Sequence, residues 1–287
     1  MVYHVYYACK GVVHPFIPPG AQDGTVKETN NPVKRTLEAG GTSFGAWMQF
    51  GHPGIAEVFA TAGFPWVAMD CEHTDIGIAE FMACARGMHG RGSLPLARVR
   101  ENDTLAIRQI LDAGAGGVIV PLVQGPADAE RAVAAAMYPP RGIRGSAFVR
   151  ANDYGLRFDE YAAAANRDTL VIVMAESRAA VENIEETLAV DGVDGVFIGP
   201  YDLSASYGIP GQISHPAIRD ARRRILEACG RTGKAAGIHL VRFDPADVAA
   251  AVRDGFRFVA LGMDNIFLQQ GARAALDAVR AATGGRA

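Results

Sequence analysis

Short apolar runs rich in β-branched residues alternate with helix-like segments along most of the chain. Eight such runs occur, at 44–50, 66–70, 94–99, 116–123, 170–176, 195–199, 235–241 and 256–262. Because nearly every position in these runs is apolar, both faces of each strand should be covered. Eight strands that alternate with helices over about 250 residues predict an α/β protein with a (β/α)₈ TIM-barrel fold.

The segments between the runs carry the signals of helix ends. Asp103 precedes one helical pattern and Gly114 follows it, and Asp244 and Gly255 bracket another pattern in the same way. Aspartate caps helix amino ends, and glycine adopts the left-handed conformation beyond the last turn. An open, doubly wound sheet is the alternative architecture, but no GxGxxG turn follows the first strand.

Residues 1–31 differ from the rest of the chain because they contain prolines and polar stretches without helical or alternating periodicity. We expect a loosely ordered extension there, followed by a barrel domain over residues 32–287. The extension could be a disordered tail, an oligomer contact or an upstream start that adds nothing.

Composition limits the partners. The chain has 287 residues, 49% of them hydrophobic, and 28 basic against 31 acidic side chains give a net charge of −3. No basic field exists to attract nucleic acid or anionic lipid, so neither partner is expected. No apolar run reaches the roughly 20 residues that span a bilayer. The four cysteines form no CxxC pair, which is typical of a reducing compartment, and we expect a cytoplasmic protein.

Polar residues close several of the apolar runs. Asp70 and His73 follow the second run, Arg98 ends the third, Glu176 ends the fifth, and Asp202 follows the sixth. The carboxyl ends of barrel strands form the mouth in which TIM-barrel enzymes carry their active sites. Strand alternation places Arg98 on the face of its strand that points into the barrel. We therefore expect these side chains to converge.

These residue types suggest a metal-assisted reaction. Glu176 and Asp202, from consecutive strands, would repel each other unless a cation lies between them, and oxygen ligands favour Mg²⁺ or Mn²⁺. The carboxylate and keto oxygens of a 2-oxo acid could fill open positions on such an ion. Arg98 could donate hydrogen bonds to the developing charge, and His73 could move the proton, with its ring oriented by Asp70 or another carboxylate.

Simpler interpretations exist for each residue. A carboxylate at a strand end is often a solvated charge or a helix cap, His73 could be structural, and Arg98 could pair with a barrel carboxylate. His239 could line the mouth, although a core histidine with a backbone partner is the safer interpretation. Cys71 lies between two acidic residues, which raise a thiol pKa, so it is not expected to be a nucleophile. No lysine closes any run, which argues against a Schiff-base aldolase.

Several segments together form a family pattern. They are G-x-W at Gly45 and Trp47, AGFPWVAMDCEH, LPLARVREND, GGVIVPLV, YPPRGIRG, and VDGVFIGPYDLS downstream of the Glu-Ser pair that begins at Glu176. Over residues 32–280 the chain resembles the class II, metal-dependent pyruvate aldolases typified by 4-hydroxy-2-oxoheptanedioate aldolase.

The resemblance implies a TIM barrel that binds Mg²⁺, Mn²⁺ or Co²⁺ and cleaves a 4-hydroxy-2-oxo acid into pyruvate, or a related 2-oxo acid, and an aldehyde through a metal-bound enolate. It implies a homo-oligomer, a hexamer or another trimer-based assembly, that exchanges a C-terminal helix. Glu176 and Asp202 match the metal ligands, His73 the base and Arg98 the residue that stabilises the enolate. Asp112 matches an aspartate that raises the basicity of the histidine. Because Asp112 lies near the end of its helix, a neighbouring subunit would have to supply it.

Two positions depart from the family pattern. Met174 stands where the family usually has a glutamine that contacts the pyruvyl unit, and Tyr201 stands where a small residue is common. A thioether cannot donate the lost hydrogen bond, so the 2-oxo acid need not be plain pyruvate. Decarboxylation or an acyl-CoA-type lyase reaction stays open, as does a phosphate-binding isomerase or a barrel without catalytic activity. The expected substrate contacts are Arg98, Met174, Gly199, Tyr201 and Asp202.

Overall fold

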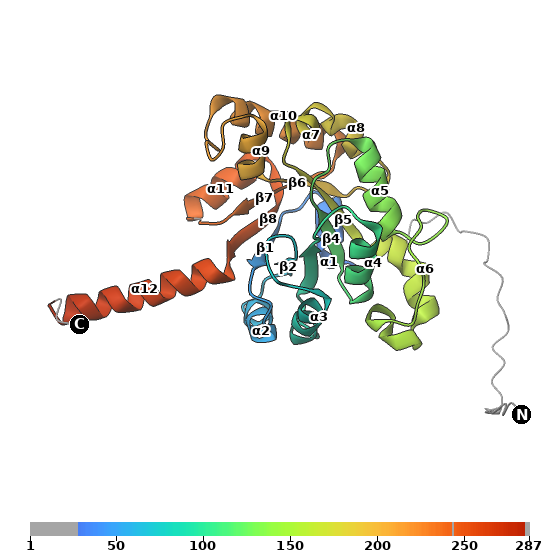
Figure 1. Ribbon diagram of the computed structural model, residues 1–287, viewed down its shortest axis with the longest axis horizontal. Helices are drawn as coiled ribbons and strands as arrows, with labels where there is room; N and C mark the ends of the chain where they lie inside the picture. Colours follow the sequence, from blue (N-terminus) through green and yellow to red (C-terminus); the bar gives the residue numbers. More distant parts are fainter. Residues whose placement is uncertain (1–27, 243, 285–287) are drawn as a thin grey trace, which may run out of the picture.

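Eight parallel strands close into a barrel in the computed structural model, which describes residues 28–242 and 244–284 (Figure 1). The strands are β1 (Ser43–Met48), β2 (Trp66–Asp70), β3 (Leu94–Arg98), β4 (Gly117–Val120), β5 (Leu170–Ala175), β6 (Gly195–Ile198), β7 (Ala235–Leu240) and β8 (Phe256–Met263). Each strand pairs with the next in sequence, and β8 pairs with β1. The predicted TIM barrel is confirmed, and the open-sheet alternative is wrong.

The helices between the strands form the outer layer of the barrel, and one further helix precedes β1 and another follows β8 (Figure 1). They are α1 (Pro32–Glu38), α2 (Pro53–Thr61), α3 (Ile78–Gly87), α4 (Thr104–Asp112), α5 (Pro126–Ala136), the 3₁₀ helix η1 (Arg150–Gly155), α6 (Phe158–Asp168), α7 (Arg178–Glu182), α8 (Ile184–Ala189), α9 (Pro200–Ser206), α10 (Pro216–Thr232), α11 (Pro245–Asp254) and α12 (Asp264–Ala282).

The expected helix ends and strands are present, with small differences at their boundaries. Asp103 accepts hydrogen bonds from the first turn of α4, and Asp244 caps α11, which ends at the left-handed Gly255. The run 116–123 yields a strand of only four residues, Gly117–Val120. Pro121 has no N–H for the ladder and Leu122 has a positive φ of 59°, so the strand stops before them.

Large apolar side chains fill the inside of the barrel. Leu94, Leu96, Ile172 and Met174 all belong to this interior cluster, as the alternation along their strands predicts. Trp66 stacks on Phe258 with ring centroids 4.1 Å apart, near the amino ends of the strands. Val33 and Leu37 of α1 belong to the same cluster, so α1 closes this end of the barrel and leaves the other end for chemistry.

The segment before α1 is anchored where it can be described. The Asn31 side chain caps α1 and donates to the carbonyls of Gly116 and Asp168, while Thr29 and Asn30 hydrogen-bond to the Asp168 carboxylate. Residues 1–27 of the expected extension lie outside the described residues.

The last helix, α12, extends away from the barrel (Figure 1). Its first turn is attached to the barrel, because Asp264 accepts hydrogen bonds from the backbone of Gln49 and Phe50. Every residue from Leu268 to Ala282 is exposed. The predicted exchange of this helix between subunits stays a prediction.

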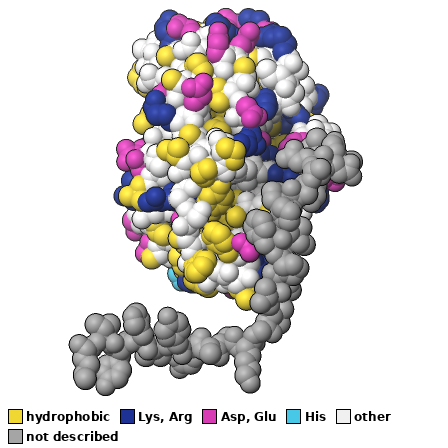
Figure 2. All heavy atoms as spheres, turned by 90° about the vertical axis from the view of Figure 1, so that its right-hand side faces the viewer, with side chains coloured by type: hydrophobic (Ala, Val, Ile, Leu, Met, Phe, Trp, Pro, Cys, Tyr) yellow, Lys and Arg dark blue, Asp and Glu magenta, His cyan; other side chains and the backbone are white. Residues whose placement is uncertain are grey.

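The surface carries charges of both signs. Acidic, basic and hydrophobic side chains are interspersed on the face that Figure 2 shows. Among the described residues, no helix combines the length and the hydropathy that a membrane crossing requires.

The packing at the closed end generates a stability prediction. A Cβ atom added to Gly45 would overlap the Trp66 indole ring. We expect Gly45→Ala to lower the free energy of unfolding by about 1–3 kcal/mol, because a filled core accommodates an added methyl group only by shifting its neighbours. Chemical denaturation measures the effect. The control is Gly271→Ala in α12, where the added methyl group meets nothing. Equal stability of Gly45→Ala and the native chain would contradict the predicted overlap.

Candidate active site

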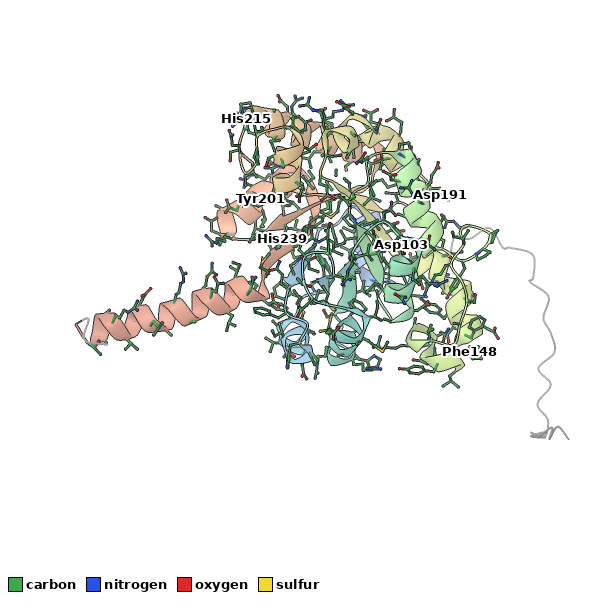
Figure 3. The ribbon with its side chains drawn as sticks, in the orientation of Figure 1. Asp103, Phe148, Asp191, Tyr201, His215 and His239 are labelled. Atoms are coloured by element: carbon green, nitrogen blue, oxygen red, sulfur yellow. The ribbon has the colours of Figure 1, made fainter. Side chains whose placement is uncertain are left out.

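A cavity of about 330 Å³ lies at the carboxyl ends of the strands. It is lined by Trp47, Gln49, Asp70, His73, Arg98, Met174, Phe197, Ile198, Gly199, Pro200, Tyr201, Asp202, His239, Val241 and Met263. Figure 3 shows Tyr201 and His239 approaching this region from α9 and β7. Most of the predicted site residues therefore meet in one place, whereas Glu176 and Asp112 are not part of the lining.

A buried ion pair forms one wall. The carboxylate of Asp70, at the end of β2, accepts two hydrogen bonds from the Arg98 guanidinium, one of them 2.9 Å long from Nε. Trp47 Nε1 lies 3.4 Å from the same carboxylate. Burial raises the pKa of Asp70, but the hydrogen bonds and charge of Arg98, together with hydrogen bonds from the His73 backbone and Trp47, hold that pKa below its usual value. Both predictions for Arg98 are thus met: it lines the mouth and it pairs with a barrel carboxylate.

The loop after β2 carries His73 and Glu72 into the mouth. The backbone N–H groups of both residues donate hydrogen bonds of 3.2 Å to Asp70 Oδ1. Asp70 therefore fixes the loop, and the predicted orientation of the His73 ring by Asp70 is not what the structure shows. The carboxylate near the ring is that of Glu72, whose Oε2 lies 3.9 Å from His73 Nε2 and 3.0 Å from Arg98 Nη1. The His73 side chain is 58% exposed and faces the opening.

Glu176 follows β5 and is only 6% exposed. Its Oε1 accepts a 2.6 Å hydrogen bond from the backbone N–H of Leu122. Leu122 has φ 59°, a conformation that costs non-glycine residues energy and is often found at functional sites. A Cβ atom at Gly199 would lie 3.0 Å from Glu176 Oε2. Glycine at position 199 therefore leaves this carboxylate oxygen uncovered.

The charges around Glu176 suit a cation. Burial raises the pKa of Glu176, and the negative charges of Glu72 and Asp202 raise it further. Among the described residues, neither Glu176 nor Asp202 forms a salt bridge, and no three metal-ligating side chains converge. Two hard carboxylate ligands would leave positions on a divalent ion for water and substrate. The uncovered oxygen of Glu176 and the excess of negative charge fit such an ion.

The two departures from the family pattern lie at different depths of the cavity. Met174 is buried, and its Cε is 3.4 Å from the position that a Cβ of Gly199 would occupy, so it forms part of the floor. Tyr201 is 59% exposed in the first turn of α9, at the rim. Met174 can shape the inner part of the cavity, and Tyr201 its entrance.

His239 is both a cavity residue and a histidine with a backbone partner. Its Nε2 lies 2.8 Å from the carbonyl oxygen of Gly262, and its ring stacks on Trp47 with centroids 5.0 Å apart. Burial lowers the pKa of His239 to about 4. Burial together with Asp70 raises the pKa of the Cys71 thiol to about 12, in agreement with the prediction that Cys71 is no nucleophile.

Asp112 does not reach the mouth of its own barrel. It ends α4, where its carboxylate accepts a 2.8 Å hydrogen bond from the fully buried Arg144, which also contacts Tyr161. This position agrees with the expectation that the helix returns to the opposite end of the barrel. A role for Asp112 near His73 would need a second subunit, and it stays a prediction.

Sequence reasoning missed two parts of the site. Glu72 was visible in the segment MDCEH, but only the fold shows that its side chain reaches Arg98 and His73. The backbone N–H of Leu122 leaves no signal in the sequence, because the orientation of a peptide group depends on the loop conformation.

The family of the chain follows from comparison with known proteins. The family model described as HpcH/HpaI aldolase/citrate lyase matches residues 43–270. A hydroxypyruvate/pyruvate aldolase from Sagittula stellata is 40% identical over 85% of this chain and 96% of its own length. A 2-keto-3-deoxy-L-rhamnonate aldolase from Klebsiella pneumoniae is 37% identical over 84% of this chain and 90% of its own.

A solved structure agrees with these relatives. The crystal structure of an HpcH/HpaI aldolase/citrate lyase family protein from Burkholderia cenocepacia superimposes with a TM-score of 0.83, at 34% identity, over 87% of this chain and 99% of the other. The chain therefore belongs to the HpcH/HpaI aldolase/citrate lyase family and is a carbon–carbon lyase of the aldolase type.

Proposed function

We propose that this aldolase cleaves a 4-hydroxy-2-oxo acid into pyruvate, or a related 2-oxo acid, and an aldehyde, and that it uses a divalent cation. The observation that carries the proposal is the uncovered oxygen of the buried Glu176, which lies near the negative charge of Asp202 at the end of the barrel where Asp202 and Arg98 line the cavity. The names of the two aldolase relatives support a 2-oxo acid as the substrate class. Mg²⁺, Mn²⁺ and Co²⁺ all accept carboxylate ligands.

Glu176 and Asp202 would hold the cation. When bound, the cation supplies Lewis-acid polarisation of the keto oxygen of the substrate. The carboxylate of Glu176 is fixed for this task by the Leu122 N–H on Oε1, which leaves Oε2 as the ligand atom.

Arg98 would stabilise the negative charge that develops on the substrate as the carbon–carbon bond breaks. Its hydrogen bonds to Asp70 use two of the five N–H groups of a guanidinium, and its contact with Glu72 is an ion pair, so N–H groups remain for the substrate. Because Asp70 holds the guanidinium plane in place, these donors are oriented before the substrate binds. Donors that are already oriented stabilise a developing charge more than mobile ones.

His73 would move the proton. A base must remove the proton of the 4-hydroxyl group as the bond between carbons 3 and 4 breaks, and an acid must return a proton to carbon 3 of the enolate. The exposed His73 ring faces the opening, and a water molecule can connect it to the substrate. The nearest carboxylate is that of Glu72, whose Oε2 lies 3.9 Å from Nε2 of the ring.

We also propose a homo-oligomer in which α12 packs on another subunit. Leu268, Ala272, Leu276 and Val279 follow helical spacing along a helix that is exposed from Leu268 onward. Isolated helices of about 12–15 residues are marginal in water, so the outer part of α12 needs a partner surface. The large apolar side chains of Ile143, Phe148, Tyr154 and Leu156, in the segment between α5 and α6, are also exposed, and Figure 3 labels Phe148.

Metal binding tests the carboxylate pair. We expect Glu176→Gln and Asp202→Asn each to weaken Mn²⁺ binding at least about tenfold, because each removes one anionic ligand. Calorimetry or the electron paramagnetic resonance signal of free Mn²⁺ measures the affinity. Asp191→Asn is the control, because Asp191 pairs with Arg141 outside the cavity. Native affinity in both site variants would rule out the proposed ligands.

Proton exchange tests the reaction. The native protein with Mn²⁺ should exchange the methyl protons of pyruvate for deuterium in heavy water, as NMR shows after removal of the metal. His73→Ala should slow this exchange by about 10²–10⁴ while Mn²⁺ affinity is retained, because only the proton carrier is lost. His89→Ala, at an exposed position outside the cavity, is the control. Absence of exchange in the native protein would overturn the proposed function, and unchanged exchange in His73→Ala would remove His73 from it.

The oligomer has its own test. Leu268→Glu combined with Leu276→Glu should lower the mass measured by light scattering, because both charges fall on the apolar stripe of α12. Gln269→Glu combined with Gln270→Glu adds the same charge beside the stripe and should leave the mass unchanged. A native chain that is monomeric at micromolar concentration, or a mass equal in both variants, would contradict the proposed packing of α12.

A further inference from the structure

Three neighbouring strands present Glu176, Gly199 and His239 at one level of the barrel. Ala175 pairs with Ile198 and Ile198 with Ile238, and each of the three positions follows its paired residue by one. Residues in register on parallel strands point to the same face, and a Cβ atom at Gly199 would indeed lie next to Glu176. Because Gly199 has no side chain, the space between Glu176 and His239 stays open.

The protonation of His239 follows from its partner. A carbonyl oxygen only accepts hydrogen bonds, so Nε2, 2.8 Å from the oxygen of Gly262, carries the proton. The low pKa keeps the ring uncharged at neutral pH. Nδ1 is then a hydrogen-bond acceptor with a free lone pair.

The acceptor atom is available to a ligand. His239 lines the cavity, and Nδ1 has no hydrogen-bond partner among the described residues. Nδ1 is also not one of the described polar atoms that protein encloses without a partner, so the cavity reaches it. Trp47 covers the ring face, and Phe197 lies 5.6 Å from Trp47 between ring centroids. A ligand in this inner part of the cavity meets aromatic walls and one acceptor.

We propose that His239 selects a 3-hydroxy-2-oxo acid over its 3-deoxy counterpart, by accepting a hydrogen bond from the hydroxyl group on carbon 3 at Nδ1. The inference rests on the proposed function, because it places the 2-oxo acid beside Glu176. The open space at Gly199 then leads from the acid to His239. Tyr201 at the exposed rim lies nearer the entrance, where the aldehyde arrives. A hydrogen atom in place of this hydroxyl group, as in pyruvate, would leave Nδ1 without a donor from the substrate.

Three substitutions of His239 distinguish the contributions of its two ring nitrogens. His239→Gln places an amide N–H near the position of Nε2 and removes the acceptor at Nδ1. His239→Asn places an amide oxygen near the position of Nδ1 and gives up the bond to Gly262. His239→Phe keeps a ring that can stack on Trp47 and removes both polar atoms. The measurement is the ratio of the rates at which the protein and Mg²⁺ exchange the carbon-3 protons of hydroxypyruvate and of pyruvate for deuterium.

We expect the ratio to fall about tenfold in His239→Gln and His239→Phe, and to stay within about threefold of the native ratio in His239→Asn, since one hydrogen bond is at stake. His89→Gln should leave the ratio unchanged. A native ratio in both the Gln and Phe variants would overturn the role of His239 and leave the proposed function standing. Native protein that exchanges the protons of neither acid would overturn the proposed function and, with it, this inference.

A second measurement does not depend on turnover. In protein labelled with ¹⁵N-histidine, the resonance of His239, assigned by its loss in His239→Gln, should show the tautomer protonated at Nε2 from pH 6 to pH 8. Hydroxypyruvate with Mg²⁺ should shift the Nδ1 resonance, and pyruvate should shift it less. Equal shifts with both acids, or a tautomer protonated at Nδ1, would contradict the proposed hydrogen bond.

Discussion

The hydrogen-bonded ion pair of Asp70 and Arg98 is the interaction on which the mouth of this barrel depends. A fully buried carboxylate is tolerated only when it is paired and its lone pairs are satisfied, and Asp70 meets both conditions through Arg98, Trp47 and two backbone N–H groups. The same contacts orient Arg98, fix the indole of Trp47 and shape the loop that carries His73. Removal of either partner would leave a buried charge and would disturb every group that borders the pair.

On the opposite side of the mouth, carboxylates outnumber the cationic side chains that could neutralise them. Glu72, Glu176 and Asp202 stand near a single cationic side chain that Asp70 already engages, so the pKa values of Glu72 and Glu176 are raised, first by burial and then by the neighbouring negative charges. Arg98 pairs with Asp70 and Glu72, whereas Glu176 and Asp202 form no salt bridge among the described residues, and the proposed divalent ion would supply the missing positive charge. In the proposed mechanism the mouth of the barrel would separate two tasks: Arg98 would stabilise developing negative charge, and Glu176 and Asp202 would retain a cation.

The sequence predicts the barrel because strand alternation and helix caps are local. It also predicts that Arg98 points inward, since alternation along one strand is a local property as well. It could not predict the partner of His73: Asp70 is three positions away, but its carboxylate is taken by a residue from the next strand. The hydrogen bond from Leu122 to Glu176 is harder to predict, because the Leu122 N–H points at the carboxylate only when this residue adopts the left-handed conformation. The tautomer of His239 is the hardest feature to predict from sequence, because it depends on the carbonyl group of a residue 23 positions away.

The absence of side chains matters as much in this cavity as their presence. Gly199 leaves Oε2 of Glu176, the proposed ligand atom, uncovered and lines the cavity together with His239, so one glycine would serve both the proposed cation and the proposed substrate contact. A side chain there would narrow the cavity at the same time as it crowded the carboxylate, so the proposed metal affinity and substrate selection would not vary independently at this position. Selection can still vary at His239, two strands away from Glu176, where a change of one hydrogen-bond acceptor leaves the carboxylates untouched. The proposed ligand for the cation and the proposed contact for the substrate thus belong to separate strands of one sheet, β5 and β7.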